Sequence, residues 1–186
     1  MIETREPQYY FADDENELLI EELIKRITRY AKYSDGSVSE KGEKFGDFTG
    51  MILNAASPRE LYETGKHVYS LSITIPSGYG ETTIEDACSI FIGVKGDANL
   101  DGVTDAKDAA SILVYAAATG AGTAEPLYSE TDAQLESFAY FLADVNGEEE
   151  KNSPLDATDA AAILTYAAAA GTGEKPDWDK ILGKTE

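Results

Sequence analysis

The sequence is poor in the residues on which most catalytic and disulfide-bonded sites depend. Its 186 residues include one cysteine, Cys88, and one histidine, His67. A single cysteine excludes a disulfide framework within the chain, and the apolar run around it, ACSIFIGV, is typical of a small buried core residue. His67 stands at the start of an expected strand, where a structural or solvated histidine is the rule. No Ser/His/Asp or Cys/His set can be assembled from these residues, so we expect a protein that is not an enzyme.

Basic residues are also scarce. Fifteen Lys and Arg stand against 35 Asp and Glu, which gives a formal net charge of -20. Such a surface repels phosphate backbones and anionic lipids, so we expect no nucleic-acid partner and no direct membrane contact. No apolar run is long enough to cross a bilayer, and no leader with basic, apolar and small residues in that order is present.

The first ninety or so residues predict a small α+β module. Residues 14–31 carry apolar side chains at helical spacing after a capping box of Asp14 and Glu17, and Gly36 ends this expected helix. The polar, glycine-rich residues 34–50 indicate a loop or an edge hairpin. The composition or alternation typical of strands is found in residues 8–12, 48–53, 67–75 and 88–94. We expect one helix packed on a small, mostly antiparallel sheet.

The most informative stretch, residues 96–120, begins as an acidic loop and continues as an apolar helix pattern. Oxygen-bearing side chains fall at positions 1, 3, 5, 9 and 12 of a twelve-residue loop: Asp97, Asn99, Asp101, Asp105 and Asp108. Gly102 stands at position 6 and the carbonyl of Val103 at position 7, which is the spacing of an EF-hand calcium loop. Position 12 is Asp, whereas EF-hands usually have Glu there.

The alternative interpretation is an acidic turn that caps a helix, because Asp and Asn favour turns and helix N-termini. A turn has no reason to repeat acids at this spacing around a glycine, so we prefer the calcium loop. Four carboxylates in one loop without a cation would cost several kcal/mol of repulsion. Order in the loop is therefore expected to depend on metal.

An internal repeat extends this interpretation to the second half. Residues 104–122 and 155–173 share thirteen identities in nineteen positions. The second loop is four residues longer than the first, and an acidic surface loop left from a decayed repeat is its alternative interpretation. Glu148, Glu149 or Glu150 remain alternatives to the position-5 ligand. The ligands predicted for the second calcium site are Asp144, Asn146, Asn152, the carbonyl of Pro154, Asp156 and Asp159.

Two further helices are expected in this half. Residues 131–142 predict a connecting helix, and Trp178, Ile181 and Leu182 predict a short terminal helix that docks back. A complete EF-hand has a helix before its loop as well as after it. Here the first loop follows a strand, so we interpret the repeats as loops that each have a single outgoing helix.

Two loop-then-helix calcium repeats separated by a linker helix resemble the dockerin module of cellulosome-type assemblies. The preceding aromatic strand, long helix and closing strand, which ends in IFIGVKGD, resemble the X-module joined to dockerins in ruminococcal scaffold and adaptor proteins. The resemblance implies an X-module at residues 1–94 and an all-α dockerin with two Ca²⁺ sites at residues 95–186. It also implies a cohesin partner on a scaffold or cell-surface protein, and an extracellular, surface-associated piece of a longer exported chain. An EF-hand-type calcium sensor or buffer is the alternative function.

The resemblance also implies where a cohesin would bind, at loop positions 10 and 11 and on one face of the following helix. These positions depart from the hydroxyl pairs and basic residues common in dockerins, and they imply an apolar, alanine-rich contact face. Some of them alternatively pack the two helices together, as we expect for Ile112, Ile163 and the alanines on their face; Tyr115 and Tyr166 are left open. The implied contacts are Ala106, Lys107, Leu113 and Val114, and in the second copy Ala157, Thr158, Leu164 and Thr165.

Overall fold

The computed structural model divides the chain into two compact units, Met1–Ile92 and Gly93–Glu186. The boundary expected from the sequence, after residue 94, lies close to this division. For some residues inside the strands only the backbone is described, and Cys88 is one of them. The structure describes residues 2–3, 8–12, 28–29, 33, 35–37, 43–44, 51–52, 62, 67–77, 80–123, 125–147 and 154–184.

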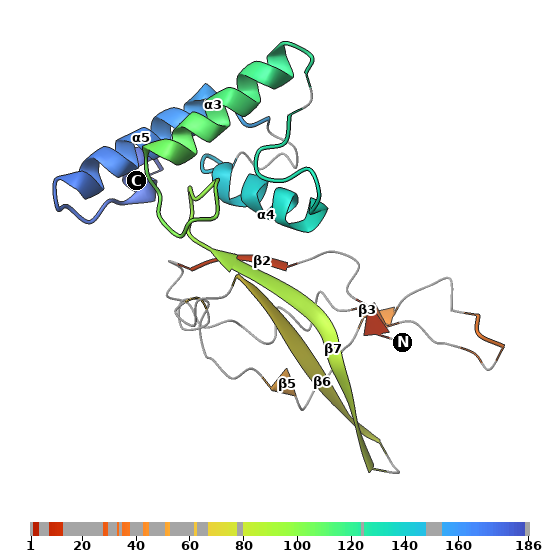
Figure 1. Cartoon of the computed structure of the whole chain (residues 1–186). Helices are drawn as coiled ribbons and strands as arrows, with labels where there is room; N and C mark the ends of the chain where they lie inside the picture. The colour runs from red at the N-terminus through yellow and green to blue at the C-terminus, as the bar shows by residue number, and fades with distance from the viewer. Residues whose placement is uncertain are drawn as a thin grey trace. The chain divides into compact units, whose positions relative to one another are not determined.

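The first unit contains two small sheets (Figure 1). In the four-stranded sheet the order is β2-β7-β6-β5, with β2 at Gln8–Phe11, β5 at Met51–Ile52, β6 at Val68–Ser77 and β7 at Gly80–Gly93. Strands β6 and β7 form a long antiparallel hairpin in which Tyr69 pairs with Ile90. The three-stranded sheet has the order β1-β3-β4, with antiparallel strands at Ile2–Glu3, Thr28–Arg29 and Glu43–Lys44.

The strand predictions for this unit are confirmed at residues 8–12 and 67–75, while β7 begins eight residues earlier than expected. The two strands remain paired close to the turn: Pro76 pairs with Glu81 and Ser77 with Gly80 at the tip of the hairpin. Ile90, Phe91 and Ile92 are all buried, so the end of β7 is covered on both faces rather than one. Phe91 meets the edge of the Tyr9 ring on β2 at a centroid distance of 5.5 Å.

The helix expected over residues 14–31 is wrong at its C-terminal end. Thr28 and Arg29 form β3 and pair with both β1 and β4. Backbone bonds to a strand on each side replace the helical bonds there, and a β-branched threonine suits a strand. Residues 13–27 lie outside the described part of the chain. The alternative of an edge hairpin in residues 34–50 agrees with a turn at residues 35–36 followed by β4.

His67 has a structural place in the first unit. Its Nδ1 lies 3.4 Å from the carbonyl oxygen of Ile92, and its own carbonyl accepts the Ile92 N–H at 2.9 Å. The His67 ring also packs near the Tyr62 ring, at a centroid distance of 5.7 Å. These contacts agree with the interpretation of His67 as a structural residue.

The second unit is helical. Its helices are α3 at Ala106–Gly120, α4 at Ala133–Ala143, α5 at Ala157–Gly171 and α6 at Trp178–Ile181, which confirms the connecting and terminal helices expected from the sequence. The repeated helices α3 and α5 lie side by side (Figure 1). Their buried core consists of Ala98, Ala109, Ile112, Ala143, Val145, Leu155, Ala160 and Ile163.

The two repeated helices bury one face and expose another. Ile112 and Ile163 are fully buried, which confirms the inward face expected from helical spacing. The next residues, Leu113 and Leu164, are each 44% exposed. The open question about the tyrosines is answered by packing: Tyr115 meets the edge of Tyr140 at 6.1 Å, and Tyr166 stacks on Trp178 at 4.3 Å between ring centroids. Both tyrosines thus pack against aromatic residues of the second unit.

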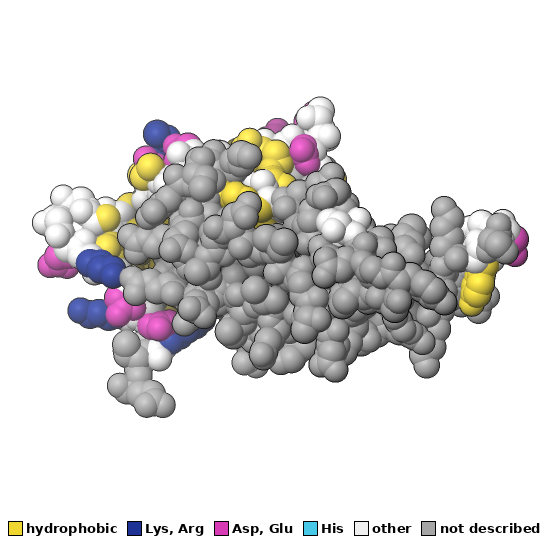
Figure 2. Space-filling model, turned by 90° about the horizontal axis from the view of Figure 1, so that it is seen from below, with side chains coloured by type: hydrophobic (Ala, Val, Ile, Leu, Met, Phe, Trp, Pro, Cys, Tyr) yellow, Lys and Arg dark blue, Asp and Glu magenta, His cyan; other side chains and the backbone are white. Residues whose placement is uncertain are grey.

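Figure 2 shows charged and apolar side chains of described residues on one face of the molecule. Lys or Arg side chains of the described residues lie next to Asp or Glu side chains there, and apolar side chains are exposed on the same face. Within the described part of the chain, no helix is both long and apolar enough to span a membrane.

Substitutions at two neighbouring residues of α5, one buried and one exposed, test which face of the helix belongs to the core. We expect Ile163→Ala to lower the free energy of unfolding of the second unit by about 2–5 kcal/mol, because it removes a fully buried side chain and leaves a cavity. Leu164→Ala is the matched control and should cost well under half as much. Urea unfolding followed by the fluorescence of Trp178, the one tryptophan, measures both; equal losses would contradict this assignment of the core.

Candidate metal centre

The first acidic loop is fixed at its entrance by close contacts. The Gly96 N–H donates to the carbonyl of Leu142 at 2.7 Å, and the Thr104 hydroxyl donates to the carbonyl of Lys95 at 2.8 Å. Gly96 has a φ of +91°, and a Cβ there would lie 2.7 Å from Cγ2 of Thr104 and 3.1 Å from the Trp178 ring. Only glycine therefore fits where α6 packs against the start of the loop.

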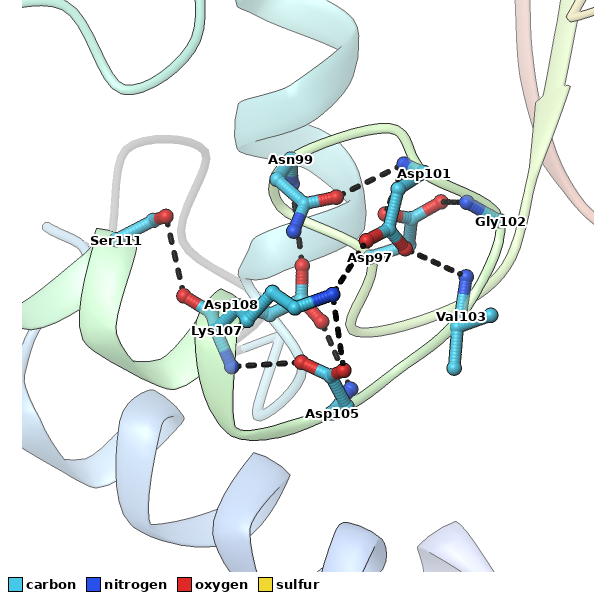
Figure 3. A network of polar contacts seen from close by, with 9 residues as sticks. All are labelled: Asp97, Asn99, Asp101, Gly102, Val103, Asp105, Lys107, Asp108 and Ser111. Carbon is cyan, nitrogen blue, oxygen red and sulfur yellow. Dashed lines mark hydrogen bonds and ion pairs between the residues drawn. The ribbon is translucent and has the colours of Figure 1, made fainter.

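The side chains at loop positions 1, 3 and 5 are turned toward the loop's own backbone (Figure 3). The Asp97 carboxylate accepts the N–H groups of Asp101 at 3.0 Å and Gly102 at 2.8 Å. Asn99 Oδ1 also accepts the Asp101 N–H, at 2.8 Å, and Asp101 Oδ1 accepts that of Val103 at 3.0 Å. Gly102 has a φ of +86°, the sharp turn for which position 6 needs a glycine. The chain is thus wrapped around three oxygen-bearing side chains.

The other end of the loop is the beginning of α3. Asp105 is the N-cap and accepts the Lys107 N–H at 2.6 Å, while Asp108 Oδ2 accepts the Asp105 N–H at 2.8 Å and completes a capping box. Asp108 Oδ1 accepts the Asn99 N–H at 3.1 Å and so joins the two ends of the loop. Helix capping accounts for Asp105 and Asp108, but it gives no reason for the acids and amide at positions 1, 3 and 5.

Burial makes this loop electrostatically costly. Asp97 and Asp108 are fully buried. Burial raises the pKa of Asp97 to about 6; the Gly102 N–H opposes the rise and the neighbouring Asp108 adds to it. Burial also raises the pKa of Asp108, against the hydrogen bonds from Asp105 and Asn99. Two buried carboxylates that interact with each other are stabilised by a bound cation, and an all-oxygen donor set suits a hard ion such as Ca²⁺.

The second loop repeats the same bonds at both of its ends. Asp156 caps α5, and Asp159 completes the capping box with the Asp156 N–H at 3.2 Å. Asp159 Oδ1 accepts the Asn146 N–H at 3.4 Å, as Asp108 does from Asn99. Asn146 is thus equivalent to Asn99, which places the four extra residues between these matched ends. Asn152, its alternatives Glu148, Glu149 and Glu150, and Ser153 lie outside the described residues.

Asn146, at position 3 of the second loop, has an unsatisfied oxygen. Its Oδ1 is buried and has no hydrogen-bond partner among the described residues, whereas Nδ2 of the same amide donates to the Thr158 hydroxyl at 3.0 Å and fixes its orientation. A buried carbonyl oxygen without a donor is costly, and position 3 of such a loop is a cation ligand. Burial also raises the pKa of Asp159. The residues present in this loop therefore fit a hard cation too.

Among the residues that the structure describes, no three His, Cys, Asp or Glu side chains are grouped so that they could hold a metal ion. The predicted ligand sets therefore stay predictions. One expectation about the repeats is wrong: α4 ends at Ala143, directly before Asp144, so the second loop has a helix on each side. The first loop does follow a strand, because β7 ends at Gly93.

Sequence reasoning missed two residues that act on the loops. The Tyr140 hydroxyl accepts the N–H of Leu155 at 2.9 Å and so fixes the end of the second loop from α4. Lys107 was expected only as a partner contact, yet its Nζ lies 3.4 Å from Asp101 Oδ2 and 3.5 Å from Asp105 Oδ2. A lysine next to a helix start is a weak sequence signal, because its long side chain can reach several acids or none.

The raised pKa of Asp97 predicts a pH dependence of stability in chelator. The fold favours the protonated carboxyl, so this stabilisation is complete below the usual value of 3.8 and is lost as pH rises through about 6. We expect the metal-free second unit to melt at a lower temperature at pH 7.5 than at pH 5, and Asp97→Asn to reduce the difference. Circular dichroism melts in chelator measure this; a melting temperature that rises over this interval would contradict the burial of Asp97.

Comparison with known proteins does not add a relationship to these observations. No model of a known protein family matches the chain, and no curated protein matches it.

Proposed function

We propose that the chain is a non-catalytic, calcium-dependent protein-interaction module of the dockerin type, preceded by an X-module. Its second unit would bind a cohesin and attach the parent protein to a scaffold or cell-surface component of an extracellular, cellulosome-like complex. One observation carries the proposal: two duplicated acidic loops make the same hydrogen bonds at the start of two duplicated helices. The bond from Asn99 to Asp108 recurs from Asn146 to Asp159.

Calcium would act in this module by neutralising buried carboxylates. Asp97, Asp108 and Asp159 are at most 1% exposed, and each belongs to a loop that leads into α3 or α5. A bound ion would hold both helix starts in place and so fix the surface that the helices share. The stabilisation grows with free calcium as RT ln(1 + [Ca²⁺]/Kd), about 2.7 kcal/mol at a hundred times Kd.

The exposed face of the helix pair supports the proposed docking role. All eight implied contacts are exposed: Ala106, Lys107, Leu113, Val114, Ala157, Thr158, Leu164 and Thr165. Val114, at 60% exposure, makes the first copy the more apolar one, because Thr165 stands at the equivalent place. Burial of one such aliphatic side chain contributes about 1.5–3 kcal/mol to binding. We infer that α3 makes the main apolar contact with the partner.

A calcium sensor or buffer remains a second candidate, and one observation favours it. Helices α4 and α5 flank the second loop as the two helices of an EF-hand do. A sensor responds to calcium by changing the angle between such helices and exposing apolar surface. Binding of a fluorescent apolar dye in calcium, without any partner, distinguishes the two functions: a sensor gains dye binding, whereas the proposed docking module loses it as its loops become ordered.

Calcium dependence is tested by the double substitution Asp97→Ala, Asp108→Ala. We expect it to remove one of two calcium-binding events in calorimetry and to lower the affinity for a cohesin at least tenfold, because the start of α3 is no longer held. Asp132→Ala, which removes the N-cap of α4 outside both loops, is the control and should leave calcium stoichiometry unchanged. Cohesin binding that persists in chelator would contradict the proposal.

Two substitutions that each add one negative charge test the position of the docking face. Val114→Asp should weaken binding to a cohesin more than tenfold, because it buries a carboxylate in an apolar contact. Gln134→Asp adds the same charge at an exposed position of α4 and should change the affinity less than twofold. Calorimetry or surface plasmon resonance against a panel of cohesins measures both variants. Equal effects of the two variants on the affinity would contradict a cohesin contact at Val114.

A further inference from the structure

Lys107 puts a positive charge at the start of α3, whereas the equivalent residue of the second copy is uncharged. Its ammonium lies between Asp101 Oδ2 and Asp105 Oδ2, at 3.4 Å and 3.5 Å (Figure 3). These acids stand at loop positions 5 and 9, and both are predicted calcium ligands. In the second copy the equivalent residue is Thr158, whose hydroxyl donates to Asp156 at 2.6 Å and accepts from the Asn146 amide. The second loop therefore has a neutral group where the first has a cation.

We propose that Lys107 is a tethered counter-ion of the first loop, which competes with calcium for Asp101 and Asp105 and is released toward the partner when calcium binds. This inference rests on the proposed function. The same two carboxylates could not give full electrostatic stabilisation to a divalent ion and to an ammonium at once, since two cations held close together repel each other. Lys107 is 72% exposed, so its release needs no rearrangement of the core.

The released side chain would lie on the docking face of α3. Lys107, Ser111 and Val114 are spaced i, i+4 and i+7, which places them on one side of the helix. The Ser111 hydroxyl donates to the Lys107 carbonyl at 3.1 Å, one turn earlier on the same side of α3. Calcium binding would thus free a positive charge beside the exposed Val114. A partner with an acidic group at that place would recognise the loaded loop better than the empty one.

The expected size of the competition is modest. Exposed ion pairs change an equilibrium constant by a factor of about two to five, and salt screens them. Thr158, which stands at the equivalent place in the second copy, carries no charge, so the two loops should bind calcium with different sensitivity to salt. The first loop should lose less of its calcium affinity as salt increases, because screening also weakens the competing lysine.

Lys107→Met and Lys175→Met test this inference as a matched pair. Each removes one positive charge, but Lys175 lies at an exposed position after the end of α5. In competitive chelator titrations with Ca²⁺ at low salt, Lys107→Met should raise the affinity of one site about two- to fivefold more than Lys175→Met does, and this difference should shrink in high salt. Equal effects of the two variants would overturn the role of Lys107 while leaving calcium binding intact.

A second measurement follows the NMR signal of the Lys107 side chain. After reductive methylation of the full chain with ¹³C, the NMR signal that disappears in Lys107→Met should shift with the first calcium equivalents, and the signal of Lys175 should stay in place. A Lys107 signal that ignores calcium, while the chain binds it, would overturn the inference alone. A wild-type chain that binds no calcium would overturn the inference and the calcium dependence of the proposed function together.

Discussion

The second unit depends on one kind of bond, the carboxylate that closes an acidic loop onto the start of its helix. Asp108 accepts N–H groups from Asn99 and Asp105, and Asp159 does the same for Asn146 and Asp156. Each carboxylate is buried, so the bond that shapes the loop also places negative charge where water cannot screen it. The loop is stable to the extent that something else neutralises this charge. We propose that a divalent cation does so in both loops; in the first loop, Lys107 also lies beside the carboxylates of Asp101 and Asp105.

The duplication gives the unit two similar halves that are not equivalent. The helix pair is nearly symmetric, with Ile112 and Ile163 buried between α3 and α5. The surroundings differ: the first loop is entered from β7 and touches Trp178 at Gly96, whereas the second follows α4 and is fixed by Tyr140. The first copy is also more apolar at Val114, which is exposed and corresponds to Thr165. The two halves of the helix pair therefore present different surfaces.

Local pattern was enough to predict much of the second unit. The spacing of apolar residues predicted α3, α4 and α5, and the Gly102 turn followed from the loop spacing, because helical period and positive φ leave direct marks on a sequence. Pairing between strands that are distant in the sequence is harder to predict from local pattern. Thr28 and Arg29 fit a helical pattern, yet two neighbouring strands take them into a sheet. The contacts of Tyr140 with Leu155 and of Trp178 with Gly96 join positions that no local period relates.

The central claim is that both acidic loops are calcium sites, and an anomalous diffraction experiment on crystals grown in calcium tests it most directly. The account predicts one peak in each loop, the first within about 2.3–2.6 Å of oxygens from Asp97, Asn99, Asp101 and Asp108. The second peak should lie at the same distance from Asn146 Oδ1, which is buried and has no hydrogen-bond donor among the described residues. Loops that keep their present hydrogen bonds in millimolar calcium, with no anomalous peak in either, would contradict the account.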